Sequence, residues 1–137
     1  MALRVQAGNR PKLDSDGFVH AVVKSIANEE SNEKHEWESL RWEFESPGTI
    51  RPIMFRVWTG LTYNPPDEKG EVNKLTNLCL RCNLLTMEQL LADEIPDIDL
   101  ETLFGQCVQF KLVKEGGLYR IDLNSVTLEG EASEKVE

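Results

Sequence analysis

The chain has 137 residues, with 15 Lys and Arg against 24 Asp and Glu, for a net charge of −9. Its length fits one domain, and its 40% apolar and 28% charged residues exclude the collagen-like, fully disordered and disulfide-scaffold classes. The acidic balance argues against a protein that coats duplex nucleic acid by bulk electrostatics. The excess acid is local, because residues 82–110 carry six acidic and no basic groups. A near-neutral surface elsewhere can therefore still bind an anion.

Cysteine usage and hydropathy indicate the compartment. Three cysteines, an odd number, fit reduced thiols better than a disulfide framework. No apolar run approaches the ~20 residues of a membrane span, and the N-terminal residues lack the apolar stretch of a secretory signal. We expect a cytoplasmic protein with a flexible arm over residues 1–15, a folded domain over 16–128 and a disordered acidic tail over 129–137.

Three strands are predicted in the first half of the domain. Residues 18–26 form a β-branched run, and residues 37–44 and 53–58 alternate between apolar and polar side chains with the period of a half-buried strand. A turn at Ser46-Pro47-Gly48 separates the second strand from the third. The side chains expected to face the core from the second and third strands are Leu40, Trp42, Phe44, Ile53, Phe55 and Val57.

A helical connector is predicted after an irregular loop over residues 61–71. Apolar residues at spacings of three and four over 72–82 predict an amphipathic helix. Thr86 with Gln89 forms a possible capping box for a second short helix. Asp97 or Asp99 can cap one further helical turn, which Gly105 would close.

The last two predicted strands cover residues 107–112 and 118–128 and are joined by a hairpin at Gly116-Gly117. The element order β-β-β-α-β-β is that of the five-stranded OB-fold barrel, in which the helix plugs one end of a closed sheet. We therefore predict an OB-fold-like barrel. The alternative is an α+β sandwich, in which the helices cover one face of an open sheet.

The connector and last strands resemble the same part of small phage-type single-stranded-DNA-binding proteins of the OB-fold class. The shared pattern is an acidic residue, Leu, two residues, Leu, one residue and Gly, followed by a strand with alternating apolar positions. This resemblance covers about a third of the chain and implies a protein that sequesters single strands in replication or recombination and recruits partners through an acidic tail. The tail here is acidic, but it lacks the aromatic or proline anchor of bacterial members. The matching residues are Asp99, Leu100, Leu103, Gly105, Val108, Phe110 and Leu112.

Aromatic and cationic side chains alternate on the predicted polar faces of the first three strands. If strand pairing gathers them on one concave surface, the indole rings can stack on unpaired bases and the cations can contact phosphates. We predict a non-enzymatic protein that binds single-stranded nucleic acid, with DNA favoured. The predicted binding residues are Trp37, Arg41, Arg56, Trp58 and Lys24, with Lys111 and Arg120 on the last two strands.

Two simpler interpretations remain open. Trp37 or Trp58 could pack beneath a loop or the N-terminal arm, and Arg41 and Arg56 could pair with nearby glutamates. The same face could instead serve as a protein-protein interaction module or as a homo-oligomer interface, because Trp and Arg are enriched at such surfaces.

The chain shows no assembled catalytic motif. Cys79 and Cys82 form a C-x-x-C, but it lies inside the predicted helix, whereas a redox C-x-x-C opens one. His20 and His35 have no metal-ligand spacing, and no phosphate-binding glycine loop is present. We predict no enzymatic activity, no cofactor and no metal.

Overall fold

The computed structural model describes residues 8–29, 38–92, 97–116 and 118–131. These residues form seven strands and a helical segment between the third and fourth of them. The chain is therefore mainly β with a helical connector, as predicted. Among the described residues, no helix has the length and apolar character needed to cross a bilayer.

The three strands predicted in the first half of the domain are present and form an antiparallel meander. They are β1 (Val19–Glu29), β2 (Ser39–Ser46) and β3 (Ile53–Thr59), each antiparallel to the next. Trp42 and Phe44 are fully buried, and the Trp42 indole N–H donates to the Thr59 hydroxyl at 3.0 Å. The period-two alternation thus places one face of the meander in the core and leaves the other toward solvent.

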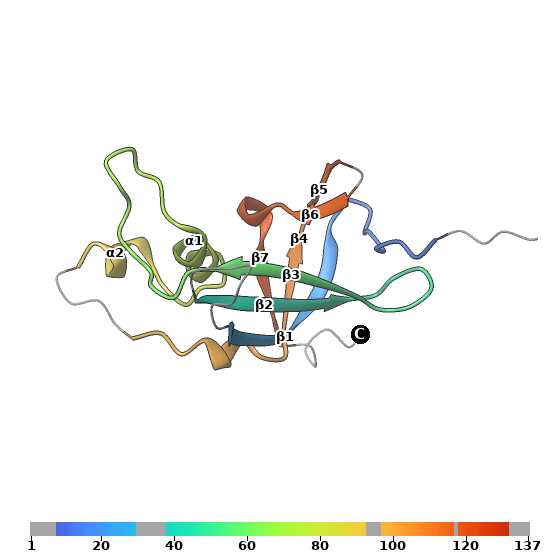
Figure 1. Cartoon of the computed structure of the whole chain (residues 1–137), viewed down its shortest axis with the longest axis horizontal. Helices are drawn as coiled ribbons and strands as arrows, with labels where there is room; N and C mark the ends of the chain where they lie inside the picture. The colour runs from blue at the N-terminus through green and yellow to red at the C-terminus, as the bar shows by residue number, and fades with distance from the viewer. Residues whose placement is uncertain (1–7, 30–37, 93–96, 117, 132–137) are drawn as a thin grey trace, which may run out of the picture.

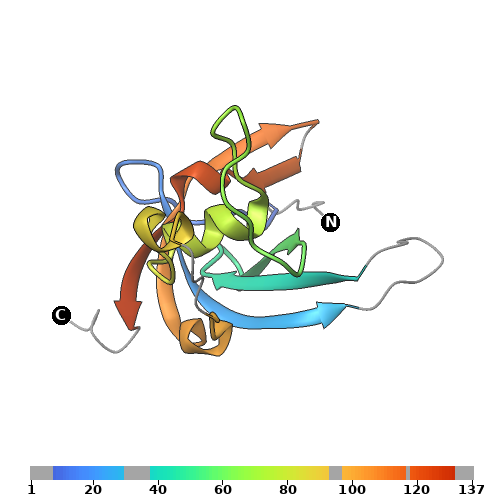
Figure 2. The ribbon, with the colours of Figure 1, turned by 90° about the vertical axis from the view of Figure 1, so that its left-hand side faces the viewer.

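The long strand β1 pairs with two neighbouring strands. Its C-terminal part pairs with β2, whereas Val19 to Val22 pair with β4 (Gln106–Phe110), which in turn pairs with β7 (Thr127–Glu131). A β-bulge leaves Lys24 as the extra residue of β1. Figures 1 and 2 show the result, a strongly coiled sheet in which β4 and β7 run across the direction of β2 and β3.

The helical connector is present as predicted, but its first helix is shorter than the predicted range 72–82. Helix α1 (Lys74–Arg81) starts at Asn73, and α2 (Met87–Leu90) has the predicted capping box of Thr86 and Gln89. Of the two candidate caps for the next turn, the structure selects Asp99, which caps the 3-10 helix η1 (Leu100–Leu103). Leu75, Leu78, Leu90 and Leu103 are buried in the same core as β1, β2 and β4.

The closed five-stranded barrel is a wrong prediction. The described strands form a five-stranded antiparallel sheet in the order β3-β2-β1-β4-β7 and a separate hairpin of β5 (Leu112–Glu115) and β6 (Leu118–Ile121). Sheet pairing therefore does not join β3 to β6 in the described part of the chain, and the sheet stays open there.

The break in the last two predicted strands has a local cause. The Asp122 carboxylate accepts a hydrogen bond from the backbone N–H of Asn124 and caps the 3-10 helix η2 (Leu123–Ser125). The Lys111 N–H donates to the Ser125 hydroxyl at 2.7 Å instead of to a strand partner. Short polar side chains that bond to the nearby backbone compete with strand pairing. Each long predicted strand is therefore split into two short ones.

Residues at both predicted ends of the folded domain, in the arm and in the tail, belong to ordered contacts or strands. Within the predicted arm, Arg10 and Thr49 exchange backbone and hydroxyl hydrogen bonds, and Pro11 bridges to Gly48. At the other end β7 reaches Glu131, which corrects the predicted start of a disordered tail at Glu129. Residues 1–7 and 132–137 lie outside the described residues.

His20 links the two ends of the domain. Its Nε2 lies 2.7 Å from Asp14, in the turn before β1, and its Nδ1 lies 2.6 Å from Glu129 on β7. The hydrogen bond with Asp14, followed by the charge of Glu129, raises the pKa of His20. Asp14 accepts hydrogen bonds from the Phe18 N–H and from His20, and these lower the pKa of its carboxyl.

Candidate nucleic-acid interface

The outer face of β1, β2 and β3 gathers four of the predicted binding residues. Cross-strand pairing places Arg41 opposite Trp58, and Glu43 opposite Arg56. Trp58 is 46% exposed, so the interpretation that its ring packs beneath a loop does not hold. Lys24, on the bulge of β1, is also exposed on this face. Trp37, the fifth residue predicted for this surface, lies outside the described residues.

Most of the cationic side chains on this outer face form ion pairs with carboxylates. Glu43 accepts a hydrogen bond from the Arg56 Nε at 2.8 Å and lies 3.9 Å from the Arg41 Nε. Lys24 pairs with Glu45 at 3.6 Å. The simpler interpretation, that the arginines pair with nearby glutamates, is therefore confirmed. A phosphate that approached this face would compete with these carboxylates.

Trp58 also has an acidic partner on this face. Its indole N–H donates to a carboxylate oxygen of Glu29, whose other oxygen lies 4.0 Å from Arg41. This bond uses the polar edge of the indole and fixes the ring at the end of β3. The π-face carries no ring contact or cation contact from another described residue.

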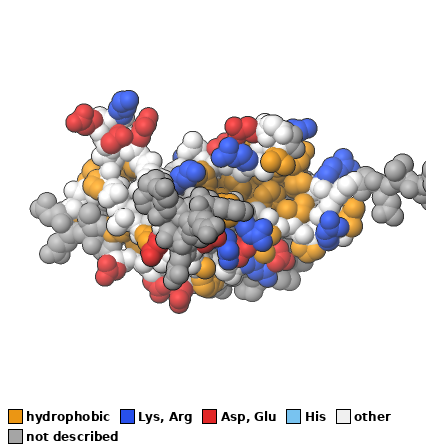
Figure 3. Space-filling model, in the orientation of Figure 1, with side chains coloured by type: hydrophobic (Ala, Val, Ile, Leu, Met, Phe, Trp, Pro, Cys, Tyr) orange, Lys and Arg blue, Asp and Glu red, His pale blue; other side chains and the backbone are white. Residues whose placement is uncertain are grey.

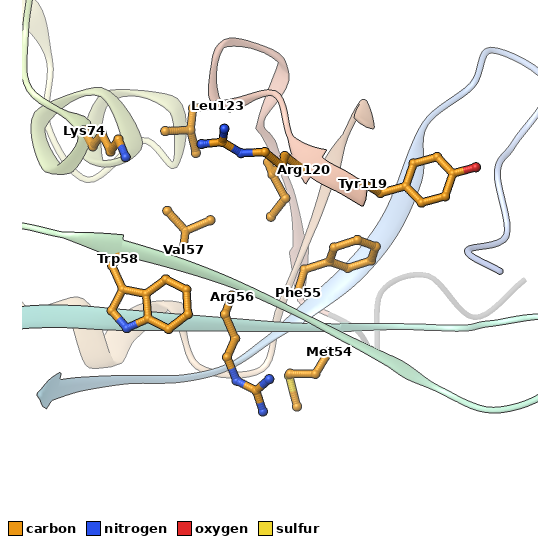
Figure 4. A pocket seen from close by; sticks show the side chains of 10 residues that line it. Met54, Phe55, Arg56, Val57, Trp58, Lys74, Tyr119, Arg120 and Leu123 are labelled. Atoms are coloured by element: carbon orange, nitrogen blue, oxygen red, sulfur yellow. The ribbon is translucent and has the colours of Figure 1, made fainter. Parts of the chain in front are cut away.

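A groove of about 390 Å³ lies where the sheet stays open, between β3, β6 and the start of α1. Its floor is apolar, with Val57 pointing from β3 toward Leu123 and Phe55 lying farther along β3, below Arg120 and Tyr119 in the view (Figure 4). Hydrophobic side chains gather over this region of the surface, and Lys and Arg side chains border them (Figure 3).

Both rims of the groove combine aromatic and cationic groups. Arg56 and Trp58 line the groove at the edge of β3, although their side chains turn toward the outer face, and Lys74, Tyr119 and Arg120 line its opposite side. Figure 4 shows Lys74 and Arg120 on either side of Leu123, with Trp58 and Arg56 on the far side of β3. Among the described residues that line this groove, none is Asp or Glu.

The charge of the groove differs from that of the outer face. Arg120 pairs with Glu115 at 2.8 Å, but both side chains are 63% exposed, so this contact contributes little. Lys74 makes no ion pair with any described residue. Lys74 is thus the groove cation without a carboxylate partner among the described residues, whereas Arg56 belongs also to the outer face and pairs there with Glu43.

Lys111 does not line the groove, so the predicted binding residues do not all lie on one surface. Its ammonium group lies 5.0 Å from the centre of the Phe18 ring, in a cation-π contact between the start of β1 and the end of β4. The sequence analysis assigned no binding role to Lys74 or Tyr119. Tyr119 is 48% exposed, because β6 belongs to a short hairpin outside the main sheet.

The C-x-x-C motif belongs to the core. Burial raises the pKa of the Cys79 thiol to about 11 and that of Cys82 to about 12. Reactive cysteines need the opposite shift, toward the thiolate. In the described part of the chain, no group of three His, Cys, Asp or Glu side chains is arranged to hold a metal ion.

Comparison of the sequence with protein-family models and with curated proteins found no match. The site therefore has to be interpreted from its own geometry.

Proposed function

We propose that the protein binds single-stranded nucleic acid, with DNA as the favoured ligand, in the groove between β3 and β6. The observation that carries the proposal is the lining of this groove, which includes the exposed aromatic residues Trp58 and Tyr119 and three cations but no described carboxylate. Two of these cations, Arg56 and Arg120, pair with carboxylates that lie outside the lining, whereas Lys74 has no ion pair with a described residue. Exposed rings stack on bases of any sequence, and cations beside them neutralise the backbone phosphates. The binding is non-enzymatic.

The arrangement of the strands and helices also supports this proposal, although it does not identify individual binding residues. We interpret the coiled meander, the connector helix and the strands that return beside β1 as an open variant of the predicted OB-fold, with the groove beside the free edge of β3. The resemblance of the connector to phage-type single-stranded-DNA-binding proteins points the same way.

The decisive measurement is tryptophan fluorescence during titration with oligo-dT. The chain has three tryptophans. In a Trp37→Phe background only the buried Trp42 and the exposed Trp58 remain, so a ligand-dependent signal reports on Trp58. Quenching should appear at low salt and fade as the salt concentration rises. No quenching at micromolar protein overturns the proposal.

Two variants locate the site. Stacking contributes about 1–3 kcal/mol per base, so Trp58→Ala or Tyr119→Ala should weaken binding about 5- to 150-fold. Anisotropy of a labelled oligomer measures the affinity of both variants. Leu118→Ala is the matched control, because Leu118 is 72% exposed on the same strand as Tyr119 but does not line the groove.

A protein partner is the second candidate function. β3 and β6 each have one neighbour in the described sheets, so each leaves a free edge that an extended acidic peptide could pair with. Under this interpretation oligo-dT fails to quench Trp58 while an acidic peptide does.

A further inference from the structure

The groove does not end at Tyr119. A second hollow of about 390 Å³ shares Met54, Phe55 and Tyr119 with it, and a third of about 240 Å³ again includes Tyr119. The second and third hollows also share Pro11. All three hollows therefore adjoin Tyr119, and together they form the surface that we call the track.

The far end of this track is built by the N-terminal segment and the β2–β3 connection. The Asn9 Nδ2 donates to the Arg51 carbonyl at 3.1 Å, and the Asn9 Oδ1 accepts from the backbone N–H groups of Ile50 and Arg51 at 2.9 and 3.2 Å. The Thr49 N–H donates to the Arg10 carbonyl at 2.8 Å. These bonds bring two arginines that are distant in sequence to one end of the track.

Arg10 and Arg51 differ from the cations of the outer face. Both are exposed, and neither makes an ion pair with a described residue. Arg51 lines the second hollow and Arg10 the third, and no Asp or Glu among the described residues lines either. A guanidinium group binds phosphate through several N–H donors at once.

We propose that Arg10 and Arg51 form a second phosphate-binding end of the track, so that the ligand is an oligonucleotide long enough to reach from Trp58 past Tyr119 to these two arginines. This inference rests on the proposed function and extends it to two residues without a predicted binding role, Arg10 in the predicted arm and Arg51 between the second and third predicted strands. It predicts that short and long oligomers bind differently, because only long ones reach the far end.

The test compares oligo-dT of about 3 nucleotides, below the roughly 4–16 nucleotides that one OB-type fold covers, with oligo-dT of about 12 nucleotides, within that range. The probes are Trp58 fluorescence and the salt dependence of affinity. The variant is Arg10→Gln with Arg51→Gln. The matched control is Arg81→Gln with Lys114→Gln, which removes two exposed charges that line none of the three hollows.

The Arg10/Arg51 variant should bind the long oligomer about tenfold more weakly. Its slope of log affinity against log salt should fall by about 0.7 for each phosphate that the variant no longer neutralises. The short oligomer should bind and quench Trp58 as in the wild type, and this also shows that the variant is folded. The inference is overturned if the Arg10/Arg51 variant matches the control, or if both oligomers lose affinity equally. Quenching by the short oligomer would then still support the proposed function, whereas absence of all quenching overturns both.

Discussion

Glu43 should limit the affinity of this protein for single strands, and Glu43→Gln tests that limit. The Glu43 carboxylate accepts hydrogen bonds from the Ser25 hydroxyl at 2.9 Å and from Arg56 at 2.8 Å, and it lies 3.9 Å from Arg41. The Ser25 bond and then the Arg56 bond lower the pKa of Glu43, so it is ionised at neutral pH. Any phosphate that contacts Arg56 must compete with this negative charge.

The size of the effect follows from the exposure of the pair. The Arg56 side chain is 49% exposed, and ion pairs at such positions contribute about 0.2–1 kcal/mol. Replacement of the carboxylate by the isosteric amide removes that competition, so binding should tighten about 1.4- to fivefold at low salt. If Arg56 gains a phosphate, the salt slope should steepen by about 0.7. The same loss of ion pairing should lower the melting temperature by about 1–4 °C.

Anisotropy titrations of labelled oligo-dT across a range of NaCl concentrations measure the affinity and its dependence on salt. Glu88→Gln is the control, because Glu88 is exposed on α2, does not line the groove, and changes the net charge by the same amount. Tighter binding in Glu43→Gln alone supports a local competition at Arg56. Equal tightening in both variants would show that only net charge matters, and the reasoning about Glu43 would be wrong.

Three further predictions concern the fold. The raised pKa of His20 means that the folded state binds a proton more tightly than the unfolded state. Protonated His20 therefore stabilises the folded protein fully below about pH 6.5, and this stabilisation is lost as the pH rises through the raised pKa. The melting temperature should therefore fall between about pH 6 and pH 8, and His20→Gln should flatten this dependence; equal slopes would contradict the sign. Cys79 and Cys82, with pKa values raised to about 11 and about 12, should resist a thiol reagent at neutral pH until the chain is unfolded in guanidinium; rapid labelling of the native protein would contradict their burial. Gly48→Ala places a Cβ 2.2 Å from the Arg51 carbonyl oxygen, so it should destabilise the protein by about 1–3 kcal/mol in urea unfolding, and an unchanged midpoint would contradict this packing.

Local signals in the sequence determined much of the fold. The alternation around Trp42 and Phe55 identified the buried face of β2 and β3, because the side-chain period of a strand depends only on the backbone. The Thr86–Gln89 capping box and the Asp99 cap lie within three residues of the groups they bind, so they too are visible in sequence.

The features that the sequence did not reveal depend on contacts between distant segments. The cap at Asp122 was hidden within an apparently regular alternation, and it decides that β6 leaves the main sheet. That departure exposes Tyr119 and opens the groove. The pairing of Arg56 with Glu43 depends on the register of β2 and β3, which no single segment specifies.

The net charge of −9 and an anion-binding groove are compatible because electrostatic attraction is local in salt solution. At physiological ionic strength the screening length is about 8 Å, so a bound phosphate responds mainly to the groups that line its own site. Arg10, Arg51, Arg56, Lys74 and Arg120 line the track, whereas none of the six acidic residues of segment 82–110 does so among the described residues. At very low salt the screening length grows to about 30 Å, and the negative charge of the whole molecule then opposes the approach of a nucleic acid. Affinity for single strands should therefore depend on the balance between the groove cations and their nearest carboxylates, of which Glu43 is the most directly engaged.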